Sequence, residues 1–94
     1  MPKKKTYRSQ AGIVYDILKA LRDEGELTAT RISCYARLPY DRLKPILIKL
    51  LEKNLIEEVN VDDKTYYRIT SRGLETLEEL EKTKKLLEAL GLRF

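Results

Sequence analysis

Two runs of helical periodicity lie on either side of the very short break Arg37-Leu38-Pro39. The run before the break has Ile32 and Ala36 on one face, and Thr28 stands where it can cap its start. The run after the break gathers its apolar residues at ~100° per residue, the period of an α-helix; these are Leu43, Ile46, Leu47, Leu50 and Leu51. We therefore predict two helices joined by a tight turn, the second from about Tyr40 to Lys53, with Leu38 as an apolar plug between them.

A β-hairpin is predicted directly after these helices. Asn54 follows the second run, and asparagine tolerates the left-handed conformation that ends a helix. Residues 56–61 and 65–69 then alternate as strands do, and Asp62-Asp63-Lys64 forms the polar turn between them. Leu27-Thr28 is short enough to supply only a brief first strand. Helix, tight turn, helix and β-ribbon is the order of a helix-turn-helix with a wing, which usually places one helix in the major groove of DNA.

A helix is predicted on each side of this unit. Ser9 suits the N-cap of a first helix that runs to about Asp23, and Gly25 is available for a left-handed C-cap. Thr70 or Ser71 caps a last helix that extends to Leu90, with Gly91 after it. The predicted class is mainly α (α+β). Its parts are a flexible basic arm over residues 1–8, a winged-helix domain over residues 9–70 and a C-terminal helix over residues 71–94.

The last helix carries an apolar stripe that outruns a compact domain. Its seam follows the heptad spacing and comprises Leu77, Leu80, Lys84 and Leu87, with Leu90 beyond it. In a monomer, leucines 80, 86, 87 and 90 would be left in water, and such a patch usually marks an interface. We predict an antiparallel coiled-coil homodimer, in which Lys84 weakens the pairing unless it reaches a glutamate of the partner.

Positive charge is concentrated in two segments of the chain. The net charge is +4, and residues 1–8 alone carry Lys3, Lys4, Lys5 and Arg8, so the remaining 15 basic and 15 acidic residues cancel. Residues 28–55 nevertheless carry more basic than acidic side chains, which suits a polyanionic partner. The predicted DNA contacts are Lys3, Lys4, Lys5, Arg8, Arg31, Arg37, Tyr40, Arg42, Lys44, Lys49, Lys64 and Arg68.

The exposed face of the second helix of the pair is mixed in character. Asp41 and Glu52 repel phosphate, and Pro45 and Ile48 are apolar where hydrogen-bond donors would be useful. Proline also removes a backbone donor. We therefore expect binding through shape and charge at least as readily as sharp base reading.

Catalytic and metal chemistry have little support. The chain has no histidine, and its one cysteine, Cys34, lacks a partner and is expected to be a half-buried helix residue. There is no phosphate-cradling glycine loop, so we predict no enzyme activity, no metal and no cofactor. No apolar run approaches the ~20 residues that span a bilayer, and polar residues follow the N-terminal lysines. A cytoplasmic, nucleoid-associated protein is expected, and the sequence names no small-molecule effector.

Five ordered blocks resemble the small archaeal winged-helix DNA-binding proteins, including chromatin-type members that dimerise through a C-terminal antiparallel coiled coil. The blocks are Tyr7-Arg8-Ser9, Ile17-Leu18, Ala36-Arg37-Leu38-Pro39-Tyr40, Leu50-Leu51-Glu52-Lys53-Asn54-Leu55-Ile56 and Tyr67-Arg68-Ile69-Thr70-Ser71-Arg72-Gly73. The resemblance implies double-stranded DNA as partner, Tyr40 to Lys49 as the reading helix and the turn from Asp62 to Lys64 as the wing tip.

The resulting hypothesis is a dimeric double-stranded DNA-binding protein, either a transcription regulator or a nucleoid-associated chromatin protein. Two alternatives stay open. One is a protein–protein interaction adaptor that uses the apolar Pro45 and Ile48 face. The other is an RNA-binding module, in which tyrosines stack on bases; the candidates are Tyr35, Tyr40, Tyr66 and Tyr67, of which Tyr66 and Tyr67 point to opposite strand faces.

Overall fold

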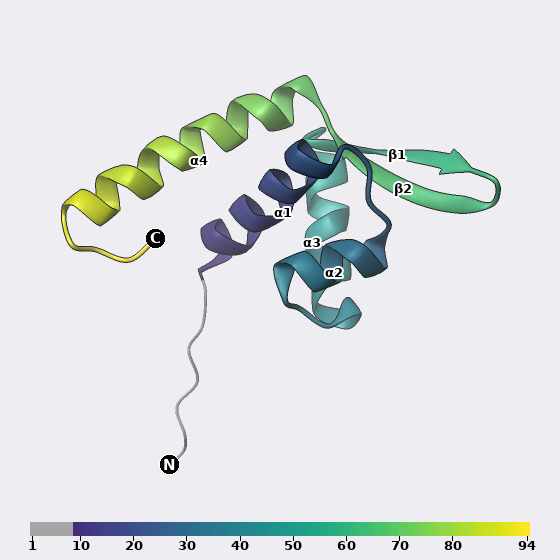
Figure 1. Cartoon of the computed structure of the whole chain (residues 1–94), viewed down its shortest axis with the longest axis horizontal. Helices are drawn as coiled ribbons and strands as arrows, with labels where there is room; N and C mark the ends of the chain where they lie inside the picture. Colours follow the sequence, from purple (N-terminus) through teal and green to yellow (C-terminus); the bar gives the residue numbers. More distant parts are fainter. Residues whose placement is uncertain (1–8) are drawn as a thin grey trace, which may run out of the picture.

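The computed structural model describes residues 9–94 of the chain. The elements are α1 (Gln10–Glu24), α2 (Ala29–Ala36), α3 (Tyr40–Glu52), β1 (Ile56–Val61), β2 (Lys64–Ile69) and α4 (Ser71–Ala89) (Figure 1). This is the predicted order of helices and strands, so the winged-helix architecture with a long last helix is confirmed. Within residues 9–94, no helix is both long and apolar enough to cross a membrane.

Side-chain caps fix the start of three of the helices. Each cap oxygen accepts a hydrogen bond from a backbone N–H in the first turn: Ser9 from Gly12 at 3.0 Å, Thr28 from Arg31 at 3.3 Å and Thr70 from Gly73 at 3.0 Å. Such caps satisfy one of the donors that the first turn leaves unpaired. The three predicted caps are therefore confirmed, with Thr70 rather than Ser71 before α4. Pro39 precedes α3 without a side-chain cap.

Three helices end in the same backbone pattern. A residue with positive φ follows each helix, and the next N–H reaches back to a carbonyl of the last turn, as in the Schellman motif. The positive-φ residues are Arg37, Asn54 and Gly91, and the closing bonds run from Leu38 to Ser33, from Leu55 to Leu50 and from Leu92 to Leu87. The predicted stop at Asn54 is confirmed. Gly25 after α1 differs from the predicted left-handed cap, because its ψ of −74° lies outside that region.

The core lies where α1, α2 and α3 meet the base of the hairpin and the start of α4. Each of these elements supplies at least one buried apolar residue, and Leu38 is buried as the predicted plug; the largest fully buried side chains are Ile17, Leu18, Leu21, Ile32, Leu43, Ile56 and Leu77. No polar or charged side chain among residues 9–94 is buried. The fold is therefore held by apolar burial, at roughly 1.5–3 kcal/mol for each fully buried leucine or isoleucine.

The hairpin is tighter than predicted. Ile56 pairs with Ile69 at its base and Val61 with Lys64 at its tip, so Lys64 belongs to β2 and the predicted three-residue turn is wrong by one residue. Asp62 and Asp63 make the turn with φ of 50° and 65°, which is the geometry of two-residue hairpins. The predicted first strand is reduced to a single bridge between Leu27 and Tyr67. The hairpin projects away from the helices (Figure 1).

Helix α4 runs back along α1 in the opposite direction (Figure 1). Arg22 pairs with Glu81 at 3.2 Å, and the Lys84 ammonium lies 5.2 Å from the centre of the Tyr15 ring. The chain end then returns to α1, where the Ser9 hydroxyl donates to the Phe94 carbonyl at 2.8 Å. The ring of Phe94 meets Tyr15 edge to face, with 5.7 Å between centroids.

Part of the predicted dimer seam is therefore used inside the protomer. Leu77 is 1% exposed and belongs to the core, so it has no surface left for a partner. Leu80 packs against the same core, and Leu80, Lys84 and Leu87 are half-buried rather than fully in water. Heptad spacing marks the face that is buried, but it does not say whether α1 or a second copy buries it. Leu86 and Leu90 remain exposed, at 59% and 61%.

Gly73 provides a test of how closely α4 packs onto the hairpin base. A Cβ atom at this buried position would collide with the backbone carbonyl oxygen of Leu55 and would lie 2.6 Å from Cγ1 of Ile69. We expect Gly73→Ala to lower the free energy of unfolding by about 1–3 kcal/mol, the usual cost of overpacking. Urea denaturation measures it, with the exposed Glu75→Ala as a control that changes stability by less than about 0.5 kcal/mol. Equal stability of Gly73→Ala and the wild type would contradict this packing.

Candidate nucleic-acid interface

The outward face of α3 takes no part in the core. Leu43, Leu47 and Leu50 point inward and are buried. Helical geometry then places Asp41, Pro45, Ile48 and Glu52 on the opposite face, and all of them are exposed. Arg42 and Lys49 follow one edge of this face and Lys44 the other, so cations border it on both sides.

The three cations of α3 have no acidic partner in the described part of the chain. Within residues 9–94, the side chains of Arg42, Lys44 and Lys49 form no ion pair and no hydrogen bond. Their charge is therefore not neutralised locally by any described residue. A polyanion that binds this face therefore does not have to displace a carboxylate of residues 9–94 from these cations.

Arg68, in contrast, is occupied. Its guanidinium donates to Glu57 at 2.6 Å on the paired strand and contacts Glu26 at 3.5 Å. The hydrogen bond that Arg68 donates to Glu57 is the main cause that raises the pKa of Arg68. The sequence could not reveal this, because the contact depends on the register that sets Glu57 opposite Arg68. Among the predicted contacts that the structure describes, Arg68 is thus the one left least available.

The other predicted contacts are spread over the surface. Arg31 on α2, Arg37 after it and Tyr40 at the start of α3 are exposed, with Tyr40 at 50%. Lys64 is exposed beside the hairpin turn, which extends away from the helices (Figure 1), so the structure does not bring it together with α3. The four predicted contacts of the N-terminal arm, Lys3, Lys4, Lys5 and Arg8, lie outside the described residues.

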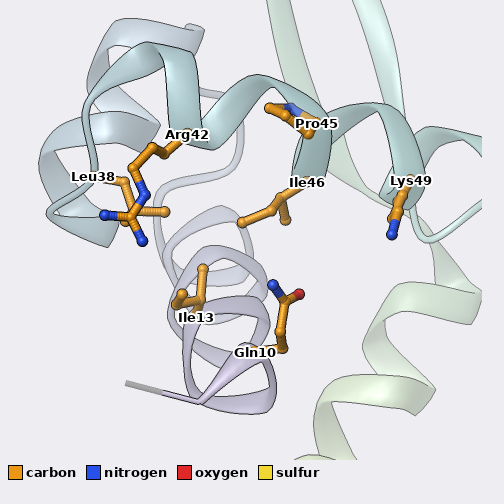
Figure 2. Close-up of a pocket in the computed structure, with 7 residues that line it drawn as sticks. All are labelled: Gln10, Ile13, Leu38, Arg42, Pro45, Ile46 and Lys49. Carbon is orange, nitrogen blue, oxygen red and sulfur yellow. The ribbon is translucent and has the colours of Figure 1, made fainter. Parts of the chain in front are cut away.

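A shallow pocket lies between the start of α1 and α3, and no pattern in the sequence predicts it. Figure 2 shows Ile13 and Ile46 pointing toward one another across it, with Arg42 and Lys49 also in its lining. Gln10, Leu38 and Pro45 complete the lining. The pocket depends on how α1 meets α3, which no local pattern encodes. It places the start of α1 beside the cationic edge of α3.

The tyrosines do not form one stacking surface. Tyr67 is half-buried against the core, and its pKa is raised mainly by this burial, then by the charges of Glu58 and Tyr40. Its backbone also pairs with Leu27 through hydrogen bonds of 2.8 and 3.0 Å. Among the tyrosines of residues 9–94, only Tyr35 and Tyr40 keep large exposed areas, at 40% and 50%. Tyr67 is therefore held as a packing residue.

No cluster of metal-ligating side chains occurs among residues 9–94. Cys34 is exposed, which differs from the half-buried position that was predicted. The reason is that Ile32 and Ala36 turn the inner face of α2 to the core, and a residue midway between them faces outward.

Comparisons with known proteins agree with this geometry. A family model described as winged helix-turn-helix matches residues 7–88. Among solved structures, the chain is similar to Sso10a-2, a DNA-binding protein from Sulfolobus solfataricus, with a TM-score of 0.80, 25% identity, 88% of this chain covered and 85% of that one. No curated protein sequence matched.

The fold also extends to longer chains. Wild-type MarR of E. coli in its apo form has a TM-score of 0.71 at 16% identity, with 77% of this chain and 55% of that chain covered. YusO of Bacillus subtilis has a TM-score of 0.73 at 20% identity, with 90% and 61% covered. This chain thus spans little more than half the length of these two proteins, and at such identities the likeness concerns the fold alone.

Two substitutions of Arg37 separate the effect of its backbone conformation on stability from the effect of its charge. It ends α2 in the left-handed conformation, with φ of 55° and ψ of 46°, which costs a residue with a Cβ more than it costs glycine. We expect Arg37→Gly to raise the free energy of unfolding by up to about 1 kcal/mol, measured by urea denaturation. Arg37→Ala removes the same charge without relieving the backbone and should be no more stable than the wild type. A glycine variant less stable than the alanine variant would contradict this reasoning.

Proposed function

The chain belongs to the winged helix-turn-helix family, and on this basis we propose that it binds double-stranded DNA, with α3 in the major groove. The observation that carries the proposal is the exposed face of α3, bordered on both edges by cations without an acidic partner in residues 9–94. An α-helix with its side chains is about 10–12 Å across and the major groove is about 12 Å wide. Cations on both edges of such a helix suit the phosphates of both strands.

The biological role that we propose is a transcription regulator or a nucleoid-associated protein of the cytoplasm. The DNA-binding description of the similar Sulfolobus protein supports this reading. Phosphate contacts would come first from Arg42, Lys44 and Lys49. Arg31, Arg37 and Tyr40 would extend the same surface.

The arm and the wing have different parts in this proposal. Lys3, Lys4, Lys5 and Arg8 precede α1, whose start lies beside the cationic edge of α3, and they suit additional phosphate contacts. The wing offers less, because Asp62 and Asp63 make its turn and carboxylates hold Arg68. Lys64 is its one remaining contact among the predicted residues. The wing would therefore serve mainly to close the core.

We also propose that the protein is a homodimer, formed by antiparallel pairing of two α4 helices about a two-fold axis. The support is the exposed apolar surface of Leu86, Leu90 and Leu92, at 59%, 61% and 57%. Leu87 and Lys84 are half-buried and would lie at the margin of this surface. This moves the centre of the interface outward from the heptad seam.

If the cations of α3 contact phosphates, single substitutions of these cations should make the affinity for DNA less dependent on salt concentration. Each cation that neutralises a phosphate adds about 0.9 to the slope of log affinity against log salt. We expect Lys44→Ala and Lys49→Ala each to lower the slope by about one unit and to weaken all duplex sequences similarly. Fluorescence anisotropy with a labelled random-sequence duplex at several salt concentrations measures both effects.

Lys82→Ala is the matched control, because it removes an exposed lysine that is paired with Glu79 on the distant α4. It should leave both the affinity and the salt slope unchanged. The docking model is wrong if Lys44→Ala and Lys49→Ala retain the wild-type affinity and slope.

The dimer proposal is tested by sedimentation equilibrium. We expect a dimer for the wild type and a monomer for Leu86→Glu, because a buried unpaired carboxylate strongly opposes association. Val61→Glu, which changes an apolar residue of 45% exposure on the hairpin, should remain dimeric. A wild type that stays monomeric at all concentrations would rule out the proposed interface.

A protein–protein adaptor is the second candidate, favoured by one observation. Ile48 is 44% exposed beside Pro45 in the middle of the α3 face, and apolar residues suit a protein partner. The anisotropy titration separates the two functions. Absence of duplex binding near 150 mM salt, about the physiological level, would favour the adaptor.

A further inference from the structure

The centre of the α3 face is apolar, although cations border it. Pro45 and Ile48 lie one turn apart in the middle of the exposed face, and Ile48 keeps 44% of its surface exposed. Figure 2 shows that Ile46, the neighbour of Pro45 in the chain, points toward Ile13 of α1. The core therefore does not account for the side chain of Ile48.

We infer that α3 reads the methyl groups of thymine, with Ile48 as the residue in contact. The inference rests on the proposed DNA binding and specifies what the same surface recognises. Base edges in the major groove present hydrogen-bonding atoms and one apolar group, the C5 methyl of thymine. An isoleucine in the middle of the helix has no hydrogen bond to offer, so this methyl is the group that matches it.

The cations on the two edges of α3 favour a docking of the helix in which the middle of its exposed face lies over the bases. Arg42 and Lys49 on one edge and Lys44 on the other suit two phosphate strands, which leaves the middle of the face over the bases. Asp41 and Glu52 lie at the two ends of the apolar stripe and repel phosphate. The stripe is therefore disfavoured along a single phosphate backbone and favoured at the floor of the groove.

Reading of guanine, the competing mode of base recognition, is less well supported by the residues of α3. Guanine is most often read by an arginine or lysine that reaches its O6 and N7 atoms. On α3 these side chains occupy the edges of the exposed face, and none lies between Asp41 and Glu52 along its centre. Discrimination between bases by α3 should therefore come from apolar contact, and the resulting differences in affinity should be modest.

Replacement of thymine by deoxyuridine tests the inference directly, because it removes the C5 methyl and leaves the hydrogen-bonding groups and the phosphates unchanged. We would compare two duplexes of alternating A·T and A·U pairs by competition anisotropy with the full chain. Burial of one methyl group corresponds to about fourfold in affinity. The wild type should thus prefer the thymine duplex by about fourfold.

Ile48→Ala is the decisive variant, and thermal melting checks that it folds. It should bind the two duplexes with nearly equal affinity while keeping the salt slope of the wild type, because the phosphate contacts are untouched. Leu74→Ala is the control, since it truncates an exposed apolar residue of 39% exposure outside α3. It should keep the fourfold preference.

Different failures are distinguishable. Equal binding of both duplexes by the wild type, with a normal salt slope, would overturn thymine reading and leave the proposed DNA binding intact. Full discrimination by Ile48→Ala would overturn the assignment to Ile48. Absence of binding to either duplex would overturn the proposed function together with this inference.

Discussion

The burial of one face of α3 is the constraint on which the rest of the structure depends. Leu43, Leu47 and Leu50 enter the core, and each leucine contributes roughly 1.5–3 kcal/mol when fully buried. Because the helix period is fixed, this burial also decides which side chains face outward. Arg42, Lys44 and Lys49 are exposed because the leucines are not. The same packing thus produces both the stability of the domain and its cationic surface.

Electrostatic pairing distinguishes the cations of this surface more sharply than charge counting does. Exposed ion pairs such as those of Arg68 and Arg22 contribute little to stability, typically about 0–1 kcal/mol. Their effect is to occupy a guanidinium that would otherwise be available to a ligand. Arg22 donates hydrogen bonds to both Asp23 and Glu81. The hydrogen bond between Arg22 and Asp23 is the main cause that lowers the pKa of the Asp23 carboxyl. The α3 cations keep their charge available within the described part of the chain.

The helices, strands and helix caps could be predicted from the sequence, but the contacts between distant segments could not. Periodicity and the residues Thr28, Asn54 and Thr70 predicted the helices, because capping and helix period are local properties. The hairpin turn was misjudged by one residue, since Asp63 adopts a positive φ that only the paired strands reveal. The occupation of Arg68 and the burial of Leu77 depend on strand register and on the path of α4. No local pattern contains either of these, and the same holds for the pocket beneath α3.

In the proposed function, the exposed face of α3 is the surface that binds duplex DNA. Backbone amide NMR of the whole chain, titrated with a short duplex, tests this most directly because it reports on every element at once. We expect the largest chemical-shift changes between Tyr40 and Lys49, smaller changes near Arg31 and Arg37, and none on the outer face of α4. Changes confined to α4, or no changes at a salt concentration where the protein stays folded, would contradict it.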